Sequence, residues 1–133
     1  MQTITSQSLP APGGHYSHGV AAQGLLFVSG QLPFDPASGT FPDGIQAQFI
    51  QAMRNVEAVL HAANTSLARL VSVHIYISDV QHWPTVNTLY AELMAEHRPA
   101  RAIIPCGELH HGARVEITAV AELPMPETRP SAV

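Results

Sequence analysis

An arginine and a glutamate near the C-terminal end are the two side chains best suited to chemistry. Arg101 begins the apolar run Ala-Ile-Ile-Pro-Cys, and Glu116 lies between Val115 and Ile117. An ionised group within such a run needs a partner or a role, because burying an unpaired charge is costly. The arginine fork fits a carboxylate, and a glutamate can position or activate a water molecule. The pair predicts binding and hydrolysis of a small carboxylate-bearing molecule; an ordinary cross-strand salt bridge, or two separate solvated ends, is the alternative.

The eight histidines and the single cysteine give weaker signals. His15 and His18 are three residues apart and His110 and His111 are adjacent, which matches no metal-binding motif such as His-Glu-x-x-His. We expect surface or interface histidines and no metal site. Cys106 has no base near it in the sequence and is expected to be a buried structural thiol. A Gly-x-Ser-x-Gly elbow, a phosphate-binding loop and a dinucleotide fingerprint are all absent from the sequence.

Hydrophobic periodicity predicts the elements that must position these side chains. Asp43 is the expected N-cap of the first helix, and Asn64 is its expected stop. The expected elements are two strands within 16–30 joined by a turn at Gln23-Gly24, a helix over 45–63, a strand over 70–78, a helix over about 84–97, and strands over 101–106 and 113–122.

Apolar residues indicate which face of each element is buried. The strand over 70–78 is expected to bury Val71, Val73, Ile75 and Ile77. The second helix is expected to bury Val86, Leu89, Tyr90 and Leu93, and the last strand Ala113, Val115, Ile117, Ala119 and Ala121.

The order of these elements predicts a mixed sheet with one uncovered face. A strand–helix–strand crossover pairs strands in parallel, whereas a hairpin pairs them antiparallel. Two helices cover only one face of such a sheet. The other face carries Tyr76 and Val120, so we expect a second subunit to cover it.

Composition excludes several classes of protein. The 133 residues, 46% hydrophobic and 12% charged, are expected to form one domain (1–133) with an irregular arm over 1–14 and a flexible tail over 124–133. The six basic residues are scattered arginines and the net charge is −4, so no basic patch for nucleic acid and no lysine for a Schiff base exist. Without a membrane-length apolar run or a secretory signal, we expect a cytoplasmic protein with no membrane partner.

Several segments, taken in order, resemble the reactive-intermediate deaminase family (RidA/YjgF, also labelled endoribonuclease L-PSP). The similarity spans about residues 12–123. The matching segments are GHYSHGV (14–20), LLFVSGQLPFDPASG (25–39), IQAQ (45–48), VNTLYAEL (86–93) and PARAIIPCGELHHGARVEITAVA (99–121).

This resemblance implies an α+β, chorismate-mutase-like fold of bacillar type: a mixed sheet with two helices on one face, assembled as a homotrimeric barrel with clefts between subunits. It implies cofactor-free hydrolysis of 2-imino or enamine acids, such as 2-aminoacrylate, to 2-keto acids and ammonia. Arg101 would then clamp the substrate carboxylate and Glu116 would orient water. The remaining site positions implied by the family are Tyr16, Ser29, Gly30, Asn87 and Tyr90.

The chain departs from the usual family pattern at four positions near these residues. His15 stands where a proline is frequent, and His18 replaces a frequent glutamine or proline. Ala102 and Ile103 follow the arginine where many active members have Ser or Thr and then Cys, which removes a hydroxyl beside the substrate. A non-catalytic metabolite-binding homotrimer that uses the same cleft is therefore the alternative. An RNA-cleaving role has no support from the charge pattern.

Overall fold

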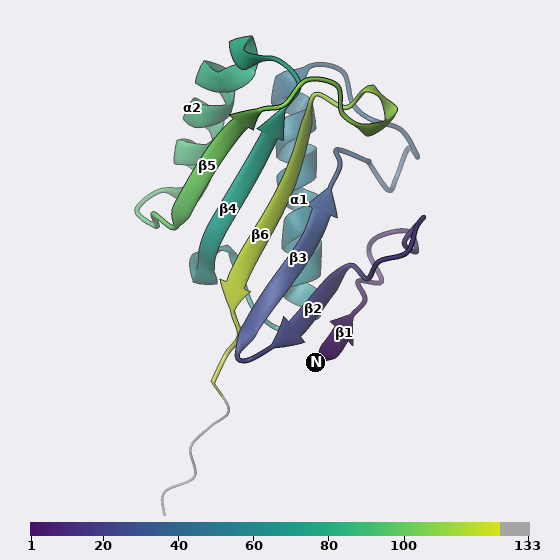
Figure 1. Cartoon of the computed structure of the whole chain (residues 1–133), viewed down its shortest axis with the longest axis vertical. Coiled ribbons are helices and arrows are strands. Elements are labelled where there is room, and N and C mark those ends of the chain that lie inside the picture. Colours follow the sequence, from purple (N-terminus) through teal and green to yellow (C-terminus); the bar gives the residue numbers. More distant parts are fainter. Residues whose placement is uncertain (126–133) are drawn as a thin grey trace, which may run out of the picture.

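The strands pair into one mixed sheet in the order β1-β2-β3-β6-β4-β5, seen in a computed structural model that describes residues 1–125 (Figure 1). Only β4 and β5 pair in parallel, as expected for strands joined by a crossover helix. The elements are β1 (Gln2–Ile4), β2 (Gly19–Ala22), β3 (Leu25–Gln31), α1 (Ile45–Ala62), β4 (Leu70–Ile77), α2 (Trp83–Met94), β5 (Ala100–Pro105) and β6 (Val115–Glu122).

Both helices pack on the same face of the sheet, which confirms the predicted layering (Figure 1). The core lies between that face and the helices. Its fully buried members include Leu26, Phe49, Val56, Leu60, Val73, Ile75, Ile77, Val86, Val115 and Ile117. No helix within residues 1–125 covers the other face, on which Phe27 is 46% exposed and pairs with Val120.

The predicted irregular arm is wrong at its start, because Gln2–Ile4 forms an edge strand. Gln2 pairs with Ala21, and Ile4 is 9% exposed at the rim of the core. Three residues are too short to show a period, so this strand depends on the partner that β2 provides. The part of the predicted flexible tail from residue 126 onward lies outside the described residues.

The first helix begins without the predicted cap. Gly44 is the N-cap residue and no side chain caps the helix, so Asp43 does not have the expected role. Asn64 is confirmed as the stop: its φ is 60°, and its N–H donates to the carbonyl of His61 at 3.0 Å. Thr65 N–H donates to Leu60 O at 3.0 Å, which completes a Schellman arrangement.

Two predicted core residues are exposed. The register of β4 against β6 shifts between Leu70 and Ser72, so Leu70 is buried and Val71 is 40% exposed. Helix α2 ends at Met94 rather than His97, and Met94 is buried whereas Leu93 is 44% exposed. The strict alternation from Val73 through Ile77 and along β6 is confirmed.

Candidate functional site

Arg101 lies on the edge strand β5 and points toward helix α2. Its Nη1 donates a hydrogen bond to Asn87 Oδ1 at 2.9 Å. Its guanidinium carbon lies 5.8 Å from the centre of the Trp83 ring and 5.1 Å from that of Tyr90, within the range of cation–π attraction. We call Trp83, Asn87, Tyr90 and Arg101 the arginine half-site.

The helix positions its three members of this half-site by their spacing. Trp83, Asn87 and Tyr90 are related as i, i+4 and i+7, so they share one face of α2. The aromatic rings and the amide hold the guanidinium in place, and no carboxylate among residues 1–125 pairs with it. The remaining N–H groups of an exposed arginine are therefore free to receive a carboxylate ligand.

Glu116 lies on β6 beside a bulge in β3. The register of β3 against β6 shifts between Val28 and Gln31, and this shift contains Ser29 and Gly30. A Cβ atom on Gly30 would lie 3.0 Å from Glu116 Oε2, so a larger residue here would push the end of the Glu116 side chain away from the backbone. The half-buried Glu116 carboxylate thus lies against the backbone of Gly30. Bulges of this kind often change the direction of a functional side chain.

The segment before β2 joins this second group through Ser29. Ser29 Oγ donates to Ser17 O at 2.6 Å, and Ser29 N–H donates to His18 O at 3.0 Å. The Ser29 hydroxyl therefore positions the segment that carries Tyr16, whose side chain is 53% exposed. We call Tyr16, Ser29, Gly30 and Glu116 the glutamate half-site.

The two half-sites lie on opposite faces of the sheet. Arg101 aligns with Val73 on β4, whereas Glu116 aligns with Tyr76. Positions three apart on a strand point to opposite faces, and the two Cα atoms are separated by about 10 Å along the strands and about 10 Å across them. The cross-strand salt bridge that the sequence left open is not among the ion pairs of residues 1–125.

Two other expectations are wrong in the structure. His18 is 4% exposed rather than on the surface: its Nδ1 accepts from Ser6 N–H at 3.0 Å, and its Nε2 bonds to Pro10 O at 2.8 Å. Cys106 is exposed rather than buried, because it follows the last residue of an edge strand.

Sequence reasoning missed Trp83 and gave no role to His111. The i, i+4, i+7 spacing of Trp83 with Asn87 and Tyr90 was a signal that could have found the first. His110 and His111 lie in a turn with ring centres 3.7 Å apart, not in a strand. Within residues 1–125 no three His, Cys, Asp or Glu side chains gather as a metal site, and no described helix is both long and apolar enough to cross a membrane.

Comparison with known proteins identifies the family of this chain. The family described as endoribonuclease L-PSP matches residues 6–123. The chain belongs to the reactive-intermediate deaminase (RidA/YjgF) family. It is 34% identical over 118 residues to Protein HMF1 of Saccharomyces cerevisiae, covering 89% of this chain and 92% of that protein.

Further members of the RidA family support both the fold and the family. The chain is 32% identical over 123 residues to a 2-iminobutanoate/2-iminopropanoate deaminase of Salmonella typhimurium, covering 90% of this chain and 96% of that enzyme. The crystal structure of the Escherichia coli YjgF gene product superposes with a TM-score of 0.87 at 31% identity, covering 92% and 98% of the two chains.

One member of the arginine half-site of this RidA-family protein has an unsatisfied polar atom. Tyr90 is 6% exposed, and its hydroxyl has no hydrogen-bond partner among residues 1–125. Burial raises the pKa of Tyr90 above its ordinary value of 10.0, and the nearby charge of Arg101 partly offsets this rise. The unfolded chain therefore loses this proton at a lower pH than the folded chain.

We expect Tyr90→Phe to change how stability depends on pH. The contribution of Tyr90 is fully present below about pH 10 and is lost as the pH rises through the folded-state pKa. Stability of the natural chain should fall more steeply than that of the variant from pH 9.5 to 11, and at pH 7 the two should differ by about 1 kcal/mol or less. Urea unfolding at fixed protein concentration measures the free energy of unfolding at each pH, and Tyr76→Phe is the matched control. Parallel curves for the natural chain and Tyr90→Phe would contradict this account.

Proposed function

We propose that the chain hydrolyses 2-imino acids and their enamine tautomers, such as 2-aminoacrylate, to 2-keto acids and ammonia. The observation that carries the proposal is the Arg101 guanidinium, which bonds to Asn87 at 2.9 Å, lies near the Trp83 and Tyr90 rings and pairs with no carboxylate of residues 1–125. A rigid fork of this kind suits the carboxylate of a small imino acid. The deaminase from Salmonella typhimurium supports this substrate class.

The proposal requires more than one copy of the chain. Arg101 and Glu116 point away from opposite faces of the same sheet, so a site that contains both needs the arginine half-site of one subunit and the glutamate half-site of another. A cyclic homotrimer would use both half-sites of every subunit and form three equivalent clefts. It would also cover the sheet face that the helices leave open.

The proposed reaction needs no covalent intermediate with the protein. Arg101 holds the carboxylate, and Glu116 orients a water molecule and takes its proton as the water oxygen bonds to C2. The electron pair of the C=N bond moves to nitrogen, which receives that proton from Glu116 and becomes an amine. Glu116 then accepts the proton of the new C2 hydroxyl and passes it to the amine nitrogen. The C–N bond breaks, ammonia leaves and the C2–O bond becomes the carbonyl of the keto acid.

Imines made in situ provide the direct test. An amino-acid oxidase acting on alanine supplies 2-iminopropanoate, and the rate of keto-acid release is measured with and without the purified chain. We expect the chain to accelerate release above the spontaneous rate in proportion to its concentration. Binding of pyruvate without any acceleration would instead indicate a non-catalytic metabolite-binding protein that uses the same cleft.

A further inference from the structure

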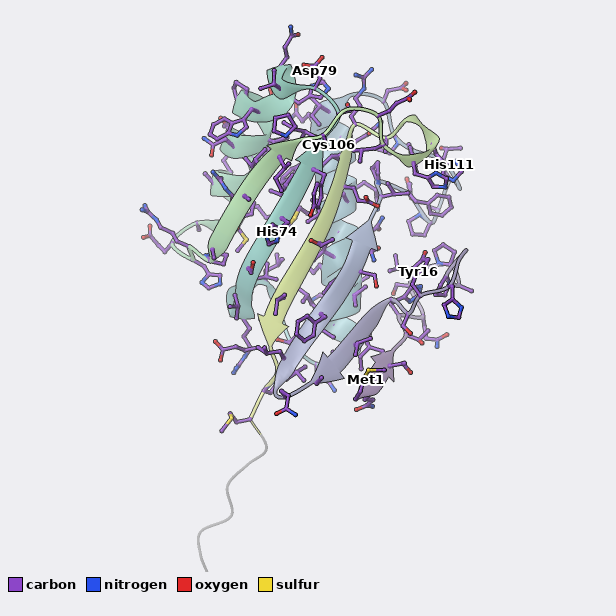
Figure 2. The ribbon with its side chains drawn as sticks, in the orientation of Figure 1. Met1, Tyr16, His74, Asp79, Cys106 and His111 are labelled. Carbon is purple, nitrogen blue, oxygen red and sulfur yellow. The ribbon has the colours of Figure 1, made fainter. Side chains whose placement is uncertain are left out.

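A cavity of about 280 Å³ continues from the glutamate half-site between three segments that are distant in sequence. It shares Tyr16 and Gly30 with that half-site. Its other walls come from the N-terminal arm, the loop after β3, and the turn that contains His111. Figure 2 shows Tyr16 and His111 on the same side of the molecule, flanking the end of β3. Glu116 is not part of the lining, but Gly30, against which Glu116 lies, borders the cavity and thus connects the two.

More of the surface that lines this cavity is apolar than polar. Leu9, Leu32, Phe34 and Phe41 contribute apolar surface. The two most deeply buried polar groups in the lining are already satisfied within the protein. His18 bonds through both ring nitrogens, and Asn55 Nδ2 donates to Leu32 O at 2.9 Å and to Phe34 O at 2.8 Å. The cavity thus suits an apolar group better than a charged one.

His111 forms one wall of the cavity. Its backbone has a conformation that residues other than glycine rarely adopt. Its φ is 58° and its ψ is 23°, which lies in the left-handed region. Its ring packs 3.7 Å from the ring of His110 and meets the edge of Phe41 at 6.4 Å, measured between ring centres. The contact with Phe41, which also lines the cavity, places the exposed imidazole at the cavity wall.

We propose that this cavity, walled by Phe41 and His111, receives the side chain of the substrate and selects 2-imino acids with a bulky apolar side chain. The proposal rests on the proposed function and names its substrate class. A substrate with a methyl side chain would leave the cavity empty. A substrate with an isobutyl or benzyl side chain would fill it, and both that side chain and the apolar cavity wall would be removed from water. Burial of that size corresponds to a preference of about 10- to 100-fold in kcat/KM.

The test compares imines that an oxidase makes from leucine and from alanine. The natural chain should show a kcat/KM ratio of about 10 to 100 in favour of the leucine imine. Ala11→Trp, at an exposed position of the lining, should lower that ratio about 10-fold by filling the cavity. His111→Asn removes the ring but tolerates positive φ, and it should lower the ratio about 3- to 10-fold. Ala37→Trp and His61→Asn, which lie outside the lining, should leave the ratio unchanged.

A binding measurement separates failure of the cavity from failure of the reaction. Calorimetry compares Kd for 4-methyl-2-oxopentanoate and for pyruvate, and we expect tighter binding of the larger keto acid, lost in Ala11→Trp. Hydrolysis of both imines at equal kcat/KM, with no response to either variant, would overturn the cavity proposal and leave the proposed function intact. Preferential binding of the larger keto acid without hydrolysis would overturn the proposed function and support the cavity. If the chain neither hydrolyses the imines nor prefers the larger keto acid, the proposed function and the cavity proposal are both overturned.

Discussion

Arg101→Ala is expected to lower kcat/KM for 2-iminopropanoate by about 10²- to 10³-fold. The substitution removes the only proposed contact to the substrate carboxylate and leaves that charge facing two aromatic rings, Trp83 and Tyr90. In the proposed cleft a neighbouring subunit would shield this pair from water, and truncating one partner of such a pair costs about 3–4 kcal/mol, which corresponds to that loss. The fold should not suffer, because Arg101 is exposed on an edge strand.

A charge-conserving variant separates the fork from the charge. Arg101→Lys keeps the positive charge but presents a single ammonium instead of two parallel N–H groups, so we expect it to recover only part of the lost activity. Arg98→Ala, at an exposed position outside both half-sites, is the matched control and should be fully active. Thermal unfolding of all three variants confirms that they are folded. An Arg101→Ala protein with unchanged kcat/KM would refute the carboxylate clamp.

Local patterns in the sequence were enough to predict most of the fold. The helix at 45–62 and the strand at 70–77 were found within one residue because their apolar periodicities are long and regular. The errors lie where a distant partner decides the structure. Whether Val71 or Leu70 is buried depends on the register of β4 against β6, and the strand at Gln2–Ile4 exists only because β2 offers an edge.

The same contrast between local patterns and distant partners explains which features of the candidate site could be predicted. Arg101 and Glu116 were conspicuous because each is a charge within an apolar run. Which face each one occupies was not readable, because it depends on the alignment of β5 and β6 with β4. The bulge at Ser29 and Gly30 was equally hidden, since it is a mismatch between two strands rather than a property of one. The sequence thus identified the chemical groups, and the structure separated them into two half-sites.

That separation leads to a prediction about mixed oligomers. Glu116→Gln keeps the shape of the side chain but removes the base, so we expect it to lower kcat by about 10²- to 10⁴-fold. An Arg101→Ala subunit retains an intact glutamate half-site, and a Glu116→Gln subunit retains an intact arginine half-site. If each cleft combines half-sites of two neighbouring subunits, a cleft formed from the two intact halves has both groups.

Mixing the two inactive variants should therefore restore activity. Equal amounts, unfolded together and refolded to exchange subunits, should recover about a quarter of the natural activity, because about one cleft in four pairs the two intact halves. Each variant refolded alone is the control for recovery of the fold, and each should remain inactive. A site built within one subunit would gain nothing from mixing, since every subunit carries one defect. Recovery near a quarter would thus establish that neighbouring subunits share the site, and an inactive mixture of well-folded oligomers would exclude it.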